Sequence, residues 1–274
     1  MKKMRRSARL VDMTQHLLAH PHTLIPLTLF AEQYGAAKSS ISEDLSIIKE
    51  AFELQGVGML KTVAGAAGGV KYIPRMKTEE ALAFMRVLIQ QLENPDRLLP
   101  GGYLYMSDIL GHPTMMAQIG KLFATAYADK DVDVVMTVET KGIPLAYATA
   151  TYLNVPVVIV RRDNKVTEGS VVSINYVSGS SKRIQTMSLA RRALAEHSRV
   201  LIVDDFMKAG GTLRGMIDLL QEFQATVVGC GVLVETTADV SERLIDEYVS
   251  LARVREVDLK GKQIAIDLGS FFEA

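Results

Sequence analysis

Two adjacent carboxylates, Asp204 and Asp205, follow an apolar run in this 274-residue chain and precede a loop of small residues. The loop leads to Gly-Gly-Thr at residues 210–212, where the pattern predicts the start of a helix. Glycines let a backbone approach a phosphate closely, and a helix start supplies free N–H groups and the positive end of the helix dipole. Carboxylates instead suit hydroxyl donors. We therefore expect a ligand with a phosphate on one side and vicinal hydroxyls on the other, as in a ribose 5-phosphate.

The segments around this loop alternate between strand-like and helix-like patterns. Strands are expected over residues 132–138, 155–160, 170–177, 199–203 and 226–234, and helices over residues 79–92, 144–153, 188–196 and 212–223. Such alternation predicts an α/β fold in which a parallel sheet is covered on both faces. Ligands of these folds bind at the carboxyl ends of the strands, which is where the two carboxylates stand.

Residues 1–74 are expected to form a smaller α+β domain ahead of the α/β domain over residues 75–274. Apolar residues at helical spacing predict helices over residues 7–20, 27–34 and 37–53, and two β-rich runs about a glycine-rich tip predict a hairpin over residues 58–74. Three helices followed by a hairpin resemble a winged-helix DNA-binding domain, whose third helix places its first side chains in the major groove.

The distribution of charge supports DNA binding by the first domain. The whole chain has no net charge, but residues 1–75 carry ten Lys or Arg against six Asp or Glu, and the remainder carries 21 against 25. The residues expected to contact DNA belong to a basic arm, the start of the third helix and the wing: Lys2, Lys3, Arg5, Arg6, Lys38, Ser39, Ser40, Ser42, Lys61 and Lys71. The competing interpretation is a protein-binding module, because Glu43 and Glu50 would repel DNA, although a carboxylate such as that of Glu43 can accept from cytosine.

Residues 200–212 closely resemble the phosphoribosyl pyrophosphate (PRPP) signature of type I phosphoribosyltransferases, in which an apolar strand, two acids and four further residues precede Gly-Gly-Thr. The resemblance implies that the acids hold the ribose hydroxyls, that residues 208–212 bind the 5-phosphate, and that the diphosphate brings Mg²⁺ held mainly by ligand oxygens and water. Residues 138–144 stand where that family has its pyrophosphate loop, and residues 178–183 where it has a mobile flap. The residues expected to bind the ligand are Asp204, Asp205, Phe206, Met207, Lys208, Ala209, Gly210, Gly211, Thr212, Glu139, Thr140, Lys141, Gly142 and Tyr103.

Two departures from the transferase pattern argue against catalysis. The position of Lys208 holds, in the hypoxanthine transferases, an aspartate that faces the purine, and a cation there cannot serve as that base. Purine transferases also often carry Ser-Tyr in the flap, where this chain has Asn175 and Tyr176. Adenine transferases have a small residue at the Lys208 position, so the first departure alone does not exclude activity. We expect a phosphoribosyltransferase fold that binds PRPP without transferring it.

A winged helix fused ahead of a PRPP-binding fold resembles, over the full length, the purine operon repressors of Gram-positive bacteria. The resemblance implies a homodimeric repressor of purine biosynthesis genes that binds operator DNA and is released by PRPP. Tyr103 and Phe206 are aromatic candidates to stack on a purine ring, although core packing is the favoured role for each, so a competing guanine nucleotide is a further candidate ligand.

Two other functions are compatible with the sequence, an active purine phosphoribosyltransferase with an N-terminal interaction module and an adaptor whose winged helix binds protein. Pyrophosphate release from PRPP on addition of a purine base would identify the first. A cytoplasmic protein without a membrane partner is expected, because the longest uncharged stretch, residues 142–160, contains two prolines and no secretory signal precedes it. Cys230 is expected to be a reduced core thiol.

Overall fold

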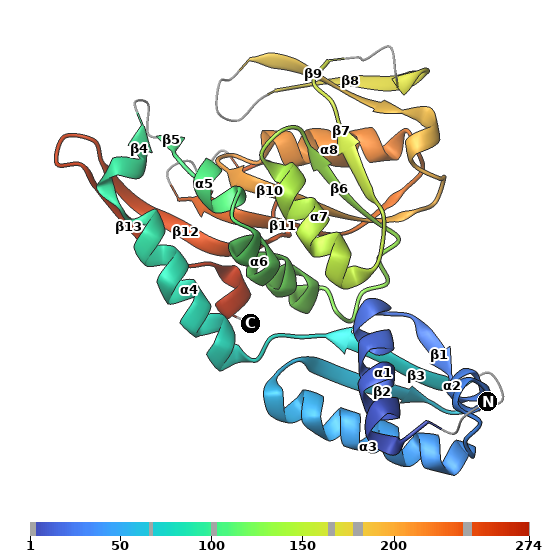
Figure 1. Ribbon diagram of the computed structural model, residues 1–274. Coiled ribbons are helices and arrows are strands. Elements are labelled where there is room, and N and C mark those ends of the chain that lie inside the picture. The colour runs from blue at the N-terminus through green and yellow to red at the C-terminus, as the bar shows by residue number, and fades with distance from the viewer. Residues whose placement is uncertain are drawn as a thin grey trace. The chain divides into compact units, whose positions relative to one another are not determined.

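A computed structural model describes residues 4–65, 68–99, 103–163, 168–177, 183–237 and 243–273 (Figure 1). Lys2 and Lys3 of the basic arm, and residues 178–182 of the expected flap, lie outside these ranges. The chain divides into two compact units, one of Met1–Lys77 with Tyr152–Asn154 and the other of Thr78–Thr151 with Val155–Ala274. None of the helices in the described ranges is long and apolar enough to cross a bilayer.

The first unit has three helices and a three-stranded antiparallel sheet of order β1-β3-β2. Its elements are α1 (Arg6–Ala19), β1 (Leu24–Pro26), α2 (Leu27–Tyr34), α3 (Lys38–Gln55), β2 (Gly58–Val63) and β3 (Gly69–Pro74). The predicted helices and the β2–β3 hairpin are confirmed. Strand β1 was not predicted, because three residues are too few to show an alternating pattern.

Buried apolar side chains join the helices of this unit. The apolar stripe of α3 faces the core, since Ile41, Ile48 and Phe52 are all at most 4% exposed. Helix α2 ends at Gly35, which adopts the left-handed conformation with φ +57° and donates its N–H to the last turn of the helix. This turn directs the chain into α3 and so fixes the helix-turn-helix arrangement.

The second unit is built on a six-stranded sheet of order β13-β12-β11-β10-β6-β7, in which only the edge strand β13 is antiparallel. The strands are β6 (Val134–Val138), β7 (Val157–Val160), β10 (Arg199–Met207), β11 (Thr226–Thr236), β12 (Val249–Asp258) and β13 (Gln263–Leu268). Its helices are α4 (Thr78–Leu92), α5 (Ser107–Leu110), α6 (Pro113–Ala126), α7 (Gly142–Leu153) and α8 (Gly211–Gln221), with short 3₁₀ turns at Pro95–Arg97, Arg191–Ala193 and Ser270–Phe272. Strands β4 (Leu98–Leu99) and β5 (Tyr103–Leu104) form a separate antiparallel pair.

Helices cover both faces of this sheet, as the α/β pattern predicts. A Cβ atom on Gly231 of β11 would lie 2.8 Å from the ring of Phe123, so α6 packs on that face. The neighbouring side chains of Cys230 and Val232 point to the opposite face and share a core with α8. Burial raises the pKa of the Cys230 thiol to about 12, so the prediction of a core thiol is confirmed.

Two predictions for this unit are wrong. Residues 188–196 form no α-helix: β9 (Ile184–Ala190) pairs with β8 (Val171–Val177) in a separate antiparallel hairpin, and only a 3₁₀ turn follows it at Arg191–Ala193. For the same reason β8 does not belong to the parallel sheet. Residues 187–190 of β9 are all buried, with Met187 and Leu189 at most 2% exposed, and this burial outweighs the helical propensity of the alanines and leucines that follow. Helix α6 and strands β12 and β13 were not predicted.

Candidate functional site

The two acidic residues lie at the carboxyl end of the central strand β10, which runs through them to Met207. Asp204 is 5% exposed, and its Oδ1 accepts a hydrogen bond from the backbone N–H of Asp205 at 3.0 Å. Burial raises the pKa of the Asp204 carboxyl well above its ordinary value, and the neighbouring carboxylate of Asp205 raises it further. Burial also raises the pKa of Asp205, against the opposing effect of the Lys141 cation. Such a pair favours a ligand that brings hydroxyl donors or positive charge.

The loop after β10 is short and leads directly into α8. Gly210 adopts φ +83°, a left-handed conformation that favours glycine, and α8 begins at Gly211. The first N–H groups of a helix have no partner within it, so this turn presents donors to an anion. Residues 208–210 are called the phosphate loop below. The sequence placed the start of the helix one residue later, at Thr212.

The second candidate loop lies beside the first because its strand, β6, is hydrogen-bonded to β10. A Cβ atom on Gly142 would lie 3.3 Å from Asp204 Oδ1 and would collide with Thr137 Oγ1. Only glycine therefore lets the start of α7 approach the buried acid. The structure thus brings together Asp204, Asp205, Lys141 and Gly142, which the sequence assigned to one site from two distant segments.

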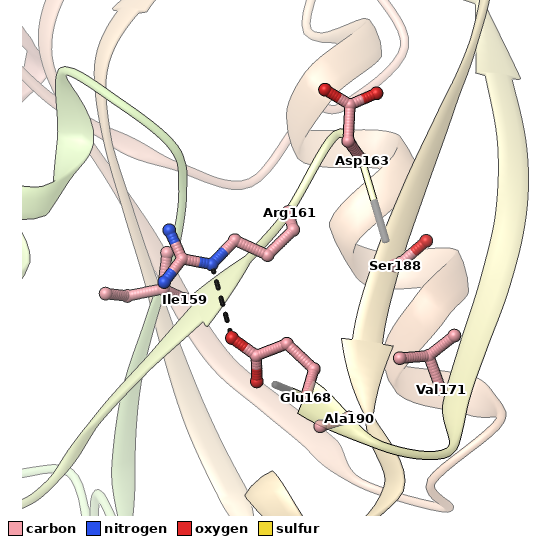
Figure 2. Close-up of a pocket in the computed structure, with 7 residues that line it drawn as sticks. All are labelled: Ile159, Arg161, Asp163, Glu168, Val171, Ser188 and Ala190. Carbon is pink, nitrogen blue, oxygen red and sulfur yellow. Dashed lines mark ion pairs between the residues drawn. The ribbon is translucent and has the colours of Figure 1, made fainter. Parts of the chain in front are cut away.

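Glu139 in the second loop has protein partners for both of its carboxylate oxygens. Its Oε2 accepts from Arg161 Nη1 at 3.0 Å and its Oε1 accepts from the backbone N–H of Arg162 at 2.8 Å. Figure 2 shows Arg161 at a small hollow, where its Nε faces Glu168 with an Nε–Oε1 distance of 3.7 Å. These contacts with Arg161 and Arg162 hold the carboxylate of Glu139 near the end of β7. The next two residues of the loop, Thr140 and Lys141, are exposed.

Arg162 and Tyr176 also belong to the surroundings of the acids. The charge of Arg162 lowers the pKa of both Asp204 and Tyr176, in each case against a larger opposing effect of burial. The Tyr176 ring packs on α8, where a Cβ atom on Gly215 would lie 2.9 Å from its Cγ. Arg162 was missed by the sequence analysis, although two arginines directly after a buried strand are a usable signal for an anion site.

The remaining predicted ligand residues differ in how they are placed. Met207 is 2% exposed and its side chain packs in the apolar core of the second unit. Phe206 is partly buried. Tyr103 lies on β5 and is 55% exposed, so the favoured role of core packing is wrong for this residue. Among the described residues there is no group of three or more His, Cys, Asp or Glu side chains that could hold a metal ion.

The predicted DNA-binding residues of α3 and the wing lie on the surface of the first unit. Lys38, Ser39 and Ser42 are exposed at the start of α3, and Ser40 is partly buried. Lys61 of β2 and Lys71 of β3 stand directly opposite each other in the antiparallel register. Like charges in this arrangement repel each other, and an anion between them would relieve the repulsion.

A buried carboxylate on α3 holds the basic arm. Asp44 has no exposed surface and accepts hydrogen bonds from Arg9 and, at 2.9 Å, from Arg6. Burial by itself raises the pKa of Asp44, but the hydrogen bonds from Arg9 and Arg6 bring it below its ordinary value. Arg6 also lies 3.7 Å from Glu43, so part of the negative charge of α3 is already balanced. Arg5 is exposed just ahead of α1.

Comparison with known proteins gives family matches for both units. Residues 5–74 match the family described as bacterial purine repressor, N-terminal, and residues 106–267 match the phosphoribosyl transferase domain. The purine biosynthesis transcriptional repressor PurR of Bacillus subtilis (strain 168) is 65% identical over 98% of this chain and 94% of that protein. The purine biosynthesis transcriptional activator PurR of Lactococcus lactis subsp. lactis (strain IL1403) is 47% identical over 98% of this chain and 99% of that protein.

Among solved structures, the second unit is similar to an adenine phosphoribosyltransferase from Thermoanaerobacter pseudethanolicus. The two chains share 22% identity with a TM-score of 0.54, over 61% of this chain and 98% of that chain. This likeness shows the fold of the second unit, and together with the two family matches it confirms the predicted fold class.

Proposed function

The chain belongs to the family of bacterial purine repressors, and from this premise we propose that it represses purine biosynthesis genes by binding operator DNA through its winged helix and is released by PRPP. The relative with 65% identity is named a repressor and the one with 47% identity an activator, which favours repression as the sense of regulation. The observation that carries the proposal is the close approach of Gly142 to Asp204, because it joins the two loops that a phosphorylated sugar with a diphosphate would need.

In the proposed complex the acids accept hydrogen bonds from the ribose hydroxyls. The N–H groups of the phosphate loop and the start of α8 bind the 5-phosphate, and Thr140, Lys141 and Gly142 face the diphosphate. Two clustered carboxylates whose pKa values are both raised by burial are a poor site for a bare phosphate and a good site for hydroxyl donors. The exposed cation of Lys141 beside Asp205 suits an anion that lies next to the sugar.

The residues present fit Mg²⁺ that arrives with the ligand. Magnesium ions retain water and commonly bind through one or two carboxylates together with phosphate oxygens, and the described residues offer a pair of acids rather than a full set of ligands. When bound, the ion would neutralise charge on the diphosphate. Asp204 and Asp205 would then stay ionised beside it and hold the sugar.

Contacts to DNA are proposed for the start of α3, the opposed lysines of the wing and the basic arm. The register that places Lys61 opposite Lys71 is the observation that supports a phosphate between them, because two like charges in this position repel each other. Ligand and DNA must favour different states or share a surface, since a ligand that binds both states equally cannot shift the equilibrium. A homodimer in the cytoplasm is part of the proposal, as the resemblance implies.

We further propose that the second unit does not catalyse phosphoribosyl transfer. At the position of Lys208, hypoxanthine transferases carry the aspartate that faces the purine. In this chain the position holds a partly buried lysine at the turn and no acid. The alternative, an active purine phosphoribosyltransferase, predicts pyrophosphate release from PRPP with adenine, guanine, hypoxanthine or xanthine. A competing guanine nucleotide remains part of the proposal, with the exposed ring of Tyr103 as the stacking candidate.

A gel-shift titration tests the proposal directly. Purified protein is bound to a promoter fragment of a purine biosynthesis gene, and PRPP with Mg²⁺ is added over a range of concentrations. The proposal expects loss of the shifted band as PRPP rises, with no loss when ribose or Mg²⁺ is added alone. Equal DNA binding with and without PRPP would show that the second unit is not the sensor.

A further inference from the structure

The phosphate loop is covered by a second segment, residues 243–245, which the sequence pattern did not indicate. The N–H of Leu244 donates to the carbonyl oxygen of Ala209 at 2.9 Å. Ile245 is 7% exposed and packs on the turn, where a Cβ atom on Gly210 would lie 3.0 Å from its Cγ1. Residues 243–245 are called the covering segment below. A backbone hydrogen bond and a side-chain contact thus fix two consecutive residues of the loop.

The covering segment is held in turn by a buried carboxylate at the end of β11. Glu235 has no exposed surface, and its Oε2 accepts hydrogen bonds from Arg243 and, at 2.6 Å, from the hydroxyl of Tyr248. Arg243 also donates to Tyr248 and to the carbonyl oxygen of Thr236, and its guanidinium lies 5.3 Å from the centre of the Tyr248 ring. Three side-chain or backbone partners thus hold the guanidinium of Arg243.

The other oxygen of Glu235 is held from a different direction. Its Oε1 accepts from Ser250 Oγ at 2.7 Å and from Arg253 Nε at 2.9 Å, and Arg253 also donates to Glu273. Both residues belong to β12, and neither is part of the covering segment. The carboxylate thus has two partners on β12 and two on the stretch between β11 and β12, which gives a natural comparison between Arg253 and Arg243.

We propose that Glu235 and Arg243 are positioning residues for phosphate binding: the ion pair fixes the covering segment, and the covering segment holds Ala209 and Gly210 in the conformation that presents N–H groups to a phosphate. The inference rests on the proposed function, since it deepens the assignment of the phosphate loop. A loop of small residues has many accessible conformations, and a site that must be ordered on binding loses affinity by the cost of that ordering. Supporting groups around a binding site commonly change affinity about tenfold or more when they are removed.

The inference is tested by comparing Arg243→Met with Arg253→Met in the full-length protein. Each substitution removes one guanidinium from Glu235 and keeps an apolar side chain of similar length. Only Arg243 is itself part of the covering segment. Binding of ribose 5-phosphate, PRPP with Mg²⁺ and inorganic pyrophosphate is measured by calorimetry. We expect Arg243→Met to weaken the binding of ribose 5-phosphate and PRPP about tenfold. The affinity for pyrophosphate should stay within about twofold, since the loop proposed to bind it follows β6. Arg253→Met should leave all three within about twofold, and Arg243→Lys should recover part of the loss because it keeps the charge beside Glu235.

Equal losses in the two methionine variants, or an unchanged affinity for ribose 5-phosphate in Arg243→Met, would overturn the inference. So would a loss of pyrophosphate binding as large as that of ribose 5-phosphate, because it would indicate a general loss of structure. If Arg243→Met does not fold, Ile245→Ala replaces it: this variant keeps every partner of Glu235 and removes the contact with Gly210, and unchanged ribose 5-phosphate binding in it would overturn the inference. Failure of the unmodified chain to bind PRPP would instead overturn the proposed function, and this inference with it.

Discussion

Asp44 accepts a hydrogen bond from Arg6, with 2.9 Å between Arg6 Nε and Asp44 Oδ1, so the basic arm is joined to α3 at a fully buried carboxylate. Arg6 was predicted from the sequence to contact DNA, and its side chain is still 54% exposed. The ion pair thus holds a partly exposed guanidinium beside the helix that is proposed to enter the major groove. Arg9, which is nearly buried, supplies the second partner of Asp44 and anchors α1 to α3.

Replacement of Asp44 by Asn should destabilise the protein and weaken DNA binding. The amide cannot accept two charge-assisted hydrogen bonds, and Arg9 would be left buried without a counter-charge, so we expect the free energy of unfolding at pH 7 to fall by about 2 kcal/mol. Because the hydrogen bonds lower the pKa of Asp44 in the folded chain, its stabilising contribution is present above the ordinary value of 3.8 and is lost as the pH falls further. Urea unfolding of both proteins between pH 7 and pH 3 measures this, and the difference between them should shrink at the acid end.

The matched control for this variant is Glu43→Gln. Glu43 directly precedes Asp44 on α3, but its side chain is 71% exposed and lies 3.7 Å from Arg6, so its removal should change stability by less than about 0.5 kcal/mol. A loss of stability in Glu43→Gln as large as that in Asp44→Asn would contradict the assignment of the stabilising ion pair to the buried carboxylate.

Replacement of Lys61 or Lys71 by Ala should weaken DNA binding without loss of stability. Each lysine faces the other across the wing, so removal of one relieves a repulsion in the free protein. If each contacts a phosphate, the slope of log K against log salt should decrease in magnitude by about one in each variant. Lys130→Ala, an exposed lysine of the second unit, serves as the control and should leave the slope unchanged. A slope in the wing variants equal to that of the control would remove Lys61 and Lys71 from the interface.

Replacement of Asp204 by Asn should stabilise the free protein and abolish its response to PRPP. Burial and the carboxylate of Asp205 raise the pKa of Asp204 in the folded chain, so ionised Asp204 opposes folding at neutral pH, and the unmodified protein gains stability as the pH falls through that raised pKa. The neutral amide removes the penalty, and we expect a gain of about 1 kcal/mol at pH 7.5 that shrinks toward acid pH. Thermal unfolding with and without PRPP and Mg²⁺ measures both effects.

DNA binding separates the two roles of this residue. Asp204→Asn and Asp205→Ala should each retain affinity for the promoter fragment while PRPP no longer releases it. Loss of DNA binding in a variant that still folds would indicate that the pocket itself contacts the duplex. In that case ligand and DNA would compete for one surface, and release of DNA by PRPP would not require two conformations of the protein.

The parts of this protein that sequence reasoning could predict are those in which neighbouring residues determine the structure. The stripe of α3 and the strand-loop-helix pattern around Asp204 each lie in one short segment, and both were predicted with only the element ends displaced by one to four residues. The β8–β9 hairpin was missed because its pairing joins residues up to 19 positions apart, such as Val171 with Ala190, and local helix propensity pointed the other way. The covering segment was not predicted for a related reason: Leu244 contacts Ala209 only because β11 and β10 are adjacent in the folded sheet.

The relationship between Gly142 and Asp204 gives the sharpest test of the site as a whole. Gly142→Ala should destabilise the protein, because the added methyl group would collide with Thr137 Oγ1, and should weaken PRPP binding, because it would also lie against Asp204 Oδ1. The second substitution Thr137→Ala removes the colliding oxygen while leaving Asp204 in place. We therefore expect the double variant to recover most of the lost unfolding free energy and to remain weak in PRPP binding, with Thr137→Ala alone as the control for both measurements. If the double variant binds PRPP as the unmodified protein does, the approach of the two loops is a packing feature of the sheet and has no part in recognition of the ligand.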